Sequence, residues 1–341
     1  MSSMQTRCKK CVMDISATEI TFDDKGVCNF CHQAQEQLQA PYIFRPVNRE
    51  ILNTKGQYNC LIGLSGGVDS SYALYMAVLF GYRPLCFSID TGYNKPEADE
   101  NIMRLVEYFK VPFFRYTIDL NKFKELQGAF LRAGVINVEI PTDHVLMAAS
   151  LEMAAKYGIK TIVSGGNVAT ESIMPPSWGH NARDLKHIKA IYKAMTGKRL
   201  SGLPLCSLFK WNVYRWWHKI KTVYILDYFD YNRAEAEQLL MDKVGFKSTG
   251  EKHEENYFTW WFQDFYLFEK FGIDKRKAHY SSMINSGQMT REDALEKLKK
   301  DPIYPTLGIE TKVMKYPIHQ HSDFPQDKWY PRIAKLVKLC A

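Results

Sequence analysis

Residues 61–71, which read LIGLSGGVDSS, decide the fold of this chain. An apolar run that begins at Tyr58 leads into this stretch and is typical of a buried strand, and helical periodicity resumes between Tyr72 and Leu79. The pattern therefore predicts a strand, an anion-binding loop and a helix in succession. Because Gly66 and Gly67 carry no Cβ, the backbone can wrap around an anion while the free N–H groups of the new helix point at it.

The polar side chains of this loop indicate what kind of anion it binds. Ser65, Ser70 and Ser71 add hydroxyl donors. The loop lacks the lysine of the Walker pattern G-x-x-x-x-G-K-[ST], and it carries Asp69 where phosphates would sit. A carboxylate beside phosphates implies a bridging Mg²⁺, so Asp69 is a candidate magnesium ligand. The alternative is a serine and glycine turn before an ordinary helix.

Beyond the loop, strand patterns alternate with helix patterns. The predicted strands are 84–89, 112–118 and 160–163, and the predicted helices are 97–109, 120–133 and one from a cap at Thr142 and Asp143 to Tyr157. This alternation predicts an α/β fold with a doubly wound parallel sheet. Ligands bind such sheets at the carboxyl ends of the strands, so the loops 65–70, 90–94 and 164–171 should face one crevice.

Four cysteines precede the sheet in the pattern Cys8-x2-Cys11-x16-Cys28-x2-Cys31. This is the paired spacing of a zinc ribbon, in which four thiolates close a tetrahedron around Zn²⁺. Four cysteines leave no open coordination position, so we interpret the zinc as structural, with a catalytic zinc as the alternative. His32 adjoins the last ligand and is expected to be a bystander.

The composition and these patterns divide the chain of 341 residues into three parts. We expect a zinc-ribbon segment at 1–45, the sheet domain at 46–170, and a mainly helical, aromatic-rich region at 171–341 that serves a substrate or a partner. No apolar run approaches the ~18 residues of a membrane span, and the first residues lack a signal-peptide pattern, so a cytoplasmic protein is expected.

The net charge of +8 suits an anionic ligand, such as ATP, a sugar nucleotide or RNA, without choosing among them. The stretch 209–219 mixes basic and aromatic residues, which is compatible with a nucleic-acid or membrane surface. Aromatic residues also fill cores, however, and lysine and arginine stems cover them, so we do not expect a nucleic-acid partner.

The S-G-G-x-D-S motif resembles the pyrophosphate-binding loop of the N-type ATP pyrophosphatases, a HUP-like (PP-loop) superfamily that includes GMP, NAD and asparagine synthetases. The resemblance implies that ATP is cleaved to AMP and pyrophosphate. It also implies a nucleotide site formed by Ser65, Gly66, Gly67, Val68, Asp69, Ser70, Ser88, Gly165, Gly166 and Asn167. The two glycines 165 and 166 can alternatively be explained as punctuation at a strand end.

Several further segments resemble one group of this superfamily, the N-acetyl sugar amidotransferases of bacterial surface-glycan pathways. They are the cysteine pairs, the loop 65–71, and the segments 141–144, 165–171, 176–179, 252–254 and 271–279. Two positions depart from the group's pattern. Val68 stands where lysine is frequent, and Glu255 directly follows Glu254, so either acid can match the group's single one.

This resemblance implies a chemical role for the enzyme. An N-acetyl amide is a poor electrophile because resonance holds its carbonyl carbon. Transfer of AMP to the amide oxygen of a nucleotide-linked sugar creates a leaving group that ammonia replaces, giving an acetamidino sugar for lipopolysaccharide O-antigen or flagellin glycan biosynthesis.

The implied catalytic residues each have a stated role and an alternative. Asp69 would hold Mg²⁺, Lys252 would stabilise charge on the α-phosphate, and His253 or Glu254 would accept a proton. Segment 252–255 can also be a charged turn facing solvent. Glu171 can serve a second magnesium, a sugar hydroxyl or the structure, while Asp143 is expected to be an N-cap and His144 a packing residue.

The sequence contains no recognisable glutaminase, because its remaining cysteines, Cys60, Cys86, Cys206 and Cys340, lack a histidine arrangement for nucleophilic catalysis. The resemblance implies that ammonia comes from separate glutaminase and barrel subunits similar to those of imidazole glycerol phosphate synthase. Two rival interpretations remain: a tRNA-thiolating enzyme of the same superfamily, which typically needs added cysteines near the loop, and a non-catalytic nucleotide-binding scaffold.

Overall fold

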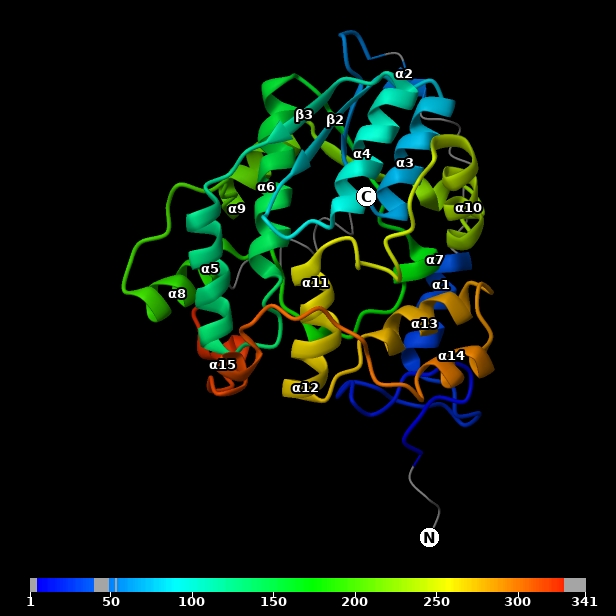
Figure 1. Cartoon of the computed structure of the whole chain (residues 1–341), viewed down its shortest axis with the longest axis vertical. Coiled ribbons are helices and arrows are strands. Elements are labelled where there is room, and N and C mark those ends of the chain that lie inside the picture. The colour runs from blue at the N-terminus through cyan, green and yellow to red at the C-terminus, as the bar shows by residue number, and fades with distance from the viewer. Residues whose placement is uncertain (1–4, 40–48, 53, 328–341) are drawn as a thin grey trace.

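Five parallel strands form one sheet in the computed structural model, which describes residues 5–39, 49–52 and 54–327 (Figure 1). The strands are β1 (Cys60–Gly63), β2 (Pro84–Ile89), β3 (Phe113–Tyr116), β4 (Thr161–Ser164) and β5 (Lys221–Tyr224). They lie in the order β3-β2-β1-β4-β5, and every pair is parallel. The order reverses between β1 and β4, which is the switch point where such sheets bind ligands. The predicted doubly wound sheet is confirmed.

Helices cover both faces of this sheet. On one face α3 (Val68–Leu79), α4 (Pro96–Phe109) and α10 (Arg233–Val244) lie side by side, as Figure 1 shows, and the other face is covered by α6 (Ile140–Lys156) and by α9 (Leu208–Asn212), which continues as a π-helical turn at Val213–Trp217. Alternate residues of β1 pack on the two faces of the sheet, because strand side chains point to opposite faces. Cys60 and Ile62 pack toward α3, while Leu61 packs toward α6.

A second core lies below the sheet in the view of Figure 1 and joins all three parts of the chain. The helices that contribute to it are α1 (Asn29–Gln39), α5 (Leu120–Ala133), α8 (Leu185–Thr196), α11 (Tyr257–Trp261), α12 (Leu267–Phe271), α13 (Arg276–Asn285), α15 (Glu310–Met314) and, through Ile140, the start of α6. A π-helical turn, Phe262–Tyr266, makes α11 and α12 one continuous helix. Phe30 of the ribbon, Phe130 of α5 and Trp261 of α11 are buried in the same cluster.

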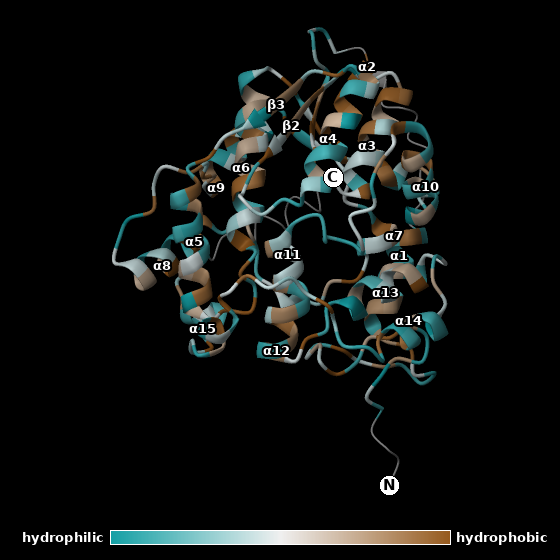
Figure 2. Cartoon of the chain, in the orientation of Figure 1, coloured by the Kyte–Doolittle hydropathy of each residue, from teal (hydrophilic) through white to brown (hydrophobic). Residues whose placement is uncertain are grey.

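The remaining elements are short. They are α2 (Arg49–Leu52), α7 (Val168–Glu171), α14 (Arg291–Lys297) and 3-10 turns at Pro176–Trp178, Ile225–Tyr228 and His321–Asp323. Hydrophilic residues occupy the outward sides of α4, α10 and α14 (Figure 2). Within the described ranges, no helix is long and apolar enough to cross a membrane. The predicted boundary at 45/46 and Cys340 lie outside the described residues.

Three details differ from the sequence-based expectation. Helix α3 begins at Val68, so Asp69 and Ser70 belong to its first turn. Helix α6 begins at Ile140 with Pro141 in its first turn and Glu139 in the cap position, so the predicted cap at Asp143 is wrong. Strand β5 arises in the region expected to be mainly helical, where only Val223 of its four residues is buried.

Candidate functional site

Two adjoining hollows, of about 870 Å³ and about 500 Å³, open at the carboxyl ends of the strands. Both are lined by Gly63, Ser65, Glu171, His253 and Glu255, so they form one continuous crevice. The loops after β1, β2 and β4 all contribute to its walls, as the strand pattern predicted. We call the two parts the larger hollow and the smaller hollow.

The loop after β1 lines the smaller hollow and presents the start of α3 to it. Gly66 has φ +80°, and a Cβ there would lie 2.2 Å from the carbonyl oxygen of Ala98, so this turn requires glycine. The N-cap residue of α3 is Gly67, which offers no side-chain cap. The first-turn N–H groups are therefore available to an anion, with the positive end of the helix dipole behind them.

The side chains of this loop are already arranged by hydrogen bonds. The Ser65 hydroxyl lies 3.0 Å from the Ser70 hydroxyl and donates to Glu255 Oε1 at 3.1 Å. Val68 packs into the core between the sheet and α3, so it offers an anion only its backbone N–H. Valine at position 68 is therefore compatible with a loop that binds an anion through its backbone.

Lys252 bridges two carboxylates beside the loop 65–70. Its Nζ lies 2.5 Å from Asp69 Oδ2, 3.0 Å from Glu171 Oε1 and 2.6 Å from the Thr170 hydroxyl. Tyr231 donates a further hydrogen bond to Asp69 Oδ1. Burial would raise the pKa of Asp69, but the Lys252 charge and these hydrogen bonds outweigh it, and the pKa of Asp69 lies below its usual value. The pKa of Lys252 is raised because the two acids outweigh its own burial.

The donor set at this point fits Mg²⁺. Asp69 and Glu171 bring two carboxylates to the edge of the smaller hollow, and each carboxylate has more lone pairs than its present partners use. Magnesium binds proteins through one or two carboxylates and completes its shell with substrate phosphates and water.

His253 lies where the two hollows meet, in the strained backbone conformation φ +70°. Its Nε2 is 3.8 Å from Glu171 Oε1, and its ring lies beside that of His279. Burial, followed by the Lys252 charge, lowers the pKa of His253, and burial lowers that of His279 further. Both imidazoles are therefore neutral at neutral pH and can accept a proton.

Of the two adjacent acids, only Glu255 faces the crevice. The Glu254 carboxylate points to Lys95, at 3.8 Å, and Glu254 does not line either hollow. Glu255 lines both, and its carboxylate lies so close to Gly67 that a Cβ on that glycine would be 2.8 Å away. Glu255, and not the predicted catalytic residue Glu254, is therefore the acid of this pair that belongs to the site.

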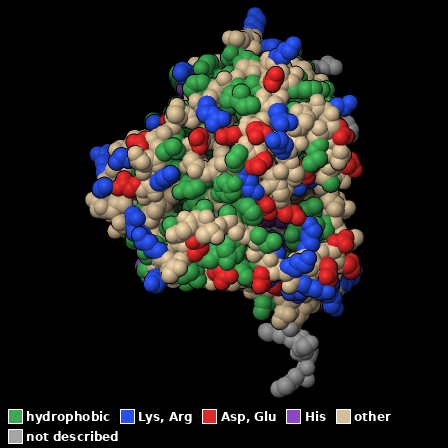
Figure 3. Space-filling model, in the orientation of Figure 1, with side chains coloured by type: hydrophobic (Ala, Val, Ile, Leu, Met, Phe, Trp, Pro, Cys, Tyr) green, Lys and Arg blue, Asp and Glu red, His purple; other side chains and the backbone are tan. Residues whose placement is uncertain are grey.

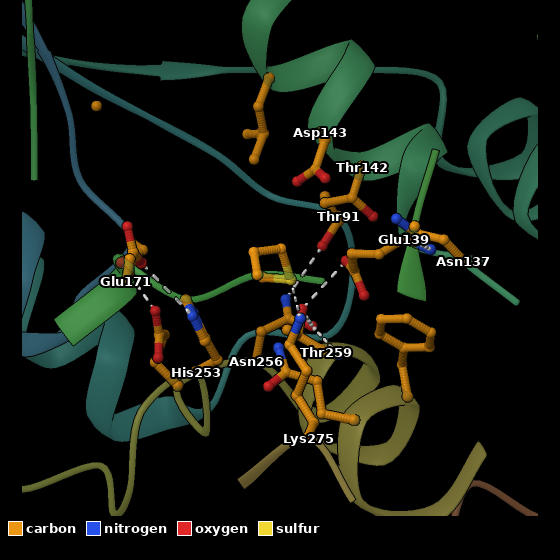
Figure 4. Close-up of a pocket in the computed structure, with 18 of the residues that line it drawn as sticks. Thr91, Asn137, Glu139, Thr142, Asp143, Glu171, His253, Asn256, Thr259 and Lys275 are labelled. Atoms are coloured by element: carbon orange, nitrogen blue, oxygen red, sulfur yellow. Dashed lines mark hydrogen bonds and ion pairs between the residues drawn. The ribbon is translucent and has the colours of Figure 1, made fainter. Parts of the chain in front are cut away.

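A group of ionisable side chains surrounds the larger hollow (Figure 4). The Thr259 hydroxyl on α11 donates to Glu139 Oε1 at 3.1 Å, while Glu139 Oε2 is buried without a partner among the described residues. Burial and the Asp143 charge raise the pKa of Glu139 to about 8. Burial likewise raises the pKa of Asp143 to about 6 and lowers that of Lys275 to about 8. These three groups can change protonation near neutral pH.

Of the other predicted nucleotide contacts, Ser88, Gly165 and Gly166 line the crevice and Asn167 does not. Ser88 lines the larger hollow, and Gly165 and Gly166 line the smaller one. A Cβ on Gly165 would lie 2.7 Å from the Asp69 backbone, so this glycine lets the end of β4 approach the start of α3. Asn167 does not line either hollow, because its side chain caps α7 by accepting from the Thr170 N–H at 2.9 Å.

The four ribbon cysteines converge on one point. The sulfur atoms of Cys8 and Cys31 are 3.9 Å apart and those of Cys11 and Cys28 are 3.7 Å apart. A tetrahedron with Zn–S bonds of about 2.3 Å has edges of about 3.8 Å, so the spacing fits zinc. All four side chains are fully buried, and backbone N–H groups and the Asn285 amide point at their sulfurs. The site is closed, as a structural zinc site requires.

The two histidines that were not expected to take part in the site, His144 and His32, have structural partners instead. His144 is buried, with its Nδ1 2.6 Å from the Ala182 carbonyl and its Nε2 accepting from the Cys206 N–H. His32 pairs with Asp23 at 2.9 Å and does not join the cysteine cluster. Cys60, Cys86 and Cys206 are buried in the sheet region.

Comparison with known structures gives three similar folds at low scores. An NH3-dependent NAD synthetase from Campylobacter jejuni is 12% identical with a TM-score of 0.31, over 44% of this chain and 63% of that one. NMN synthetase from Francisella tularensis is 15% identical with a TM-score of 0.34, over 82% and 99%. The U34-tRNA thiolase NcsA from Methanococcus maripaludis is 13% identical with a TM-score of 0.35, over 92% and 97%.

Comparison with curated sequences and family models identifies part of the chain. An uncharacterized protein of Methanocaldococcus jannaschii, MJ1599, is 30% identical over 114 residues, which are 31% of this chain; the match spans about two fifths (40%) of that relative's length. Residues 255–316 match the family described as LPS biosynthesis protein WbpG-like, C-terminal domain. This segment contains the helices from α11 to α15. From residue 255 to residue 316, the chain is therefore similar to the C-terminal domain of the WbpG-like LPS biosynthesis proteins.

Proposed function

We propose that this chain is an ATP-dependent, AMP-forming N-acetyl sugar amidotransferase of lipopolysaccharide biosynthesis. One observation carries the proposal: the phosphate loop opens into the same crevice whose far wall comes from the WbpG-like domain. Residues of that domain in the wall are Glu255, Asn256, Thr259, Phe262, Gln263, Lys275 and His279. In this proposal the triphosphate occupies the smaller hollow and a nucleotide-linked sugar occupies the larger one.

The reaction has two displacement steps. The acetamido oxygen of the sugar attacks the α-phosphorus of ATP, and pyrophosphate leaves. Ammonia then adds to the imidate carbon, loses a proton, and AMP departs with the former amide oxygen. The products are an acetamidino sugar, AMP and pyrophosphate.

The residues of the crevice suit these steps. The first-turn N–H groups of α3 and the Ser65 and Ser70 hydroxyls would hold the pyrophosphate as its charge develops. Lys252 would contact the α-phosphate from its position between Asp69 and Glu171. Mg²⁺ held by Asp69 would neutralise the leaving phosphates. His253, a neutral base at the junction of the hollows, would accept the proton from ammonia.

Ammonia would come from separate glutaminase and barrel subunits in this proposal. Burial raises the pKa of the Cys86 thiol to about 12 and also raises that of Cys60, which is unsuitable for a glutaminase nucleophile. The test is to supply the isolated chain with glutamine or with ammonium. We expect turnover with ammonium only, and glutamine-dependent turnover by the chain alone would contradict the partner proposal.

The main experiment measures the products of the isolated chain. The protein is incubated with ATP, Mg²⁺, ammonium and a panel of UDP- and CMP-linked N-acetyl sugars, and AMP and the amidine are detected by mass spectrometry. We expect sugar-dependent AMP formation. The formation of ADP, or AMP formation that depends on tRNA but not on sugar, would contradict the proposal.

The role of Asp69 can be tested in the same assay. Asp69→Asn keeps the size of the side chain but loses the charge that attracts Mg²⁺, so pyrophosphate release should fall about 100-fold or more. The exposed residue Asp301 provides the control, and Asp301→Asn should retain full activity. Near-normal turnover by a folded Asp69→Asn variant would refute the role.

A further inference from the structure

Three histidine rings meet at a point separate from the Asp69, Lys252 and Glu171 network. His180, His187 and His321 each place a ring nitrogen within 4.8 Å of the other two. His180 follows the 3-10 turn Pro176–Trp178, His187 lies in the first turn of α8, and His321 begins a later 3-10 turn. Two neighbouring segments and one distant segment of the chain therefore supply one cluster of imidazoles.

We propose that this cluster binds a divalent transition metal ion such as Zn²⁺ through three imidazole ligands. Imidazole nitrogen is a common donor for zinc, copper, iron and nickel, and it ligates in its neutral form. His187 is fully buried and its ring packs edge-on against Phe130 and Phe324, an environment that favours neutral imidazole. His321 is 9% exposed.

The distance between the ring nitrogens of His187 and His321 is close to the ligand separation in a zinc site, so metal binding would need only a small movement of the rings. His187 Nε2 lies 2.8 Å from His321 Nδ1, so one proton is shared between two nitrogens. Tetrahedral zinc with Zn–N bonds of about 2.0–2.1 Å separates its ligand nitrogens by about 3.4 Å. Binding would thus remove that proton and part the two rings by roughly 0.6 Å. The weak contact from the Asn137 N–H to His321 Nε2, 3.4 Å long, would give way because the metal-bound tautomer is protonated there.

Asp184 supplies the outer partner that metal-bound histidines usually have. Its Oδ2 lies 3.3 Å from His180 Nε2 and also accepts from the Asp327 N–H, while its Oδ1 caps α8 at the His187 N–H. These hydrogen bonds engage both oxygens, so Asp184 would orient His180 and would not ligate the metal itself. Metal-bound histidines commonly donate the N–H of their other ring nitrogen to a carboxylate in this way.

Three protein ligands leave one coordination position for water or another oxygen ligand. His180 is the member of the trio that lines the larger hollow. The open position would therefore be reached from that hollow. A bound metal would also fix the loop that carries Pro175 and Trp178, which lines the larger hollow, against α8.

Metal content tests the proposal directly. The full chain is loaded with excess Zn²⁺, desalted, and analysed for zinc per chain by mass spectrometry. We expect wild-type protein to hold one equivalent more than His187→Asn and one more than His180→Asn. This difference does not depend on which metal the cysteine cluster holds, because both variants keep all four cysteines.

The matched control is His218→Asn, which changes an exposed histidine outside the cluster and should keep the wild-type zinc content. Circular dichroism establishes that each variant is folded. If the fully buried His187 does not tolerate replacement, His180, whose side chain is 16% exposed, decides the question. Equal zinc content in wild-type protein and folded His180→Asn would overturn the proposal.

Discussion

Lys252 holds together two acidic side chains that would otherwise repel each other in a confined space. Its side chain is 10% exposed, and it contacts both Asp69 and Glu171. Removing one partner of a buried ion pair leaves an uncompensated charge, which typically costs about 3–5 kcal/mol. The network is therefore important for stability as well as for the proposed chemistry.

We predict that Lys252→Met destabilises the protein by roughly 2–5 kcal/mol at pH 7, measured by urea unfolding. In wild-type protein the lowered pKa of Asp69 contributes stability that is present above the unfolded-state pKa and is lost as pH falls through the folded value. Without Lys252, the buried Asp69 charge destabilises the folded state. The difference in unfolding free energy between wild type and variant should therefore become smaller at acidic pH, where Asp69 is protonated. Lys297→Met, at a side chain 46% exposed, is the control. An equal effect of both substitutions would contradict the buried-network argument.

Glu139 gives the opposite pH dependence. Burial and the Asp143 charge raise its pKa from 4.5 to about 8, so its contribution to stability is fully present below pH 4.5 and is lost as pH rises through about 8. Glu139→Gln cannot ionise, and it should match wild-type stability near pH 5 and exceed it by roughly 2–5 kcal/mol at pH 9. Thermal melts across this range measure the difference. The control is Glu235→Gln, at an exposed residue, and its stability should not differ from wild type in a pH-dependent way.

The sequence predicted some residues of the site and missed others for a physical reason. Ser65 and Asp69 belong to a contiguous motif whose spacing reflects one loop. Glu139 and Lys275 come from segments more than a hundred residues apart and meet only in the folded crevice. No local pattern marks them, although Lys275 and Asp143 lie in segments that carry the resemblance. Glu254 and Glu255 are adjacent and chemically equivalent. The backbone conformation decides that Glu255 faces Ser65, and this conformation cannot be predicted from the sequence alone.

At the scale of elements, the loop between β1 and α3 depends on close contact with α4. The Cβ of an alanine at position 66 would lie 2.2 Å from the Ala98 carbonyl oxygen. We predict that Gly66→Ala destabilises the protein by about 3 kcal/mol or more and abolishes ATP binding, because the loop or α4 must move. Isothermal calorimetry and urea unfolding measure the two effects.

Gly287 provides a matched control for this prediction. Its φ is +78°, close to the +80° of Gly66, but nothing lies within 4 Å of a Cβ placed there. Gly287→Ala should cost only the backbone strain of about 1–2 kcal/mol. Similar losses in the two variants would show that the positive φ, and not the contact with Ala98, is decisive at position 66.

Elements whose residues form a clear pattern of buried apolar positions were predicted from the sequence, and elements without such a pattern were not. Strand β2 has the predicted bounds because all six of its residues are buried and apolar or small. Strand β5 is an edge strand with three exposed residues, including Lys221 and Tyr224, so it lacks a buried-strand pattern. The start of α6 was misplaced because Thr142 and Asp143 resemble a cap, whereas the helix already begins at Ile140, with Pro141 in its first turn.

At the scale of the whole molecule, the three predicted parts share one interior. The second core takes side chains from the ribbon, from α5 of the sheet domain and from the WbpG-like helices. Charged side chains of both signs are spread over the face in Figure 3 around a central group of hydrophobic ones. The ribbon is also fastened to the WbpG-like segment by Arg291, which donates to the carbonyls of Cys8 and Cys11 at 3.1 Å.

This shared interior predicts that disruption of the four-cysteine cluster is felt far from the ribbon. Structural zinc supplies folding free energy, so Cys28→Ser should unfold the ribbon and remove one side of the core around Phe30 and Trp261. We expect its hydrogen exchange protection to fall in α13 and α14 as well as in residues 8–31, and its thermal transition to move down as one step. Ser201→Ala, at an exposed residue far along the chain from the cysteines, is the control. A variant that loses protection only within residues 8–31, with an unchanged main transition, would show that the ribbon folds independently of the rest.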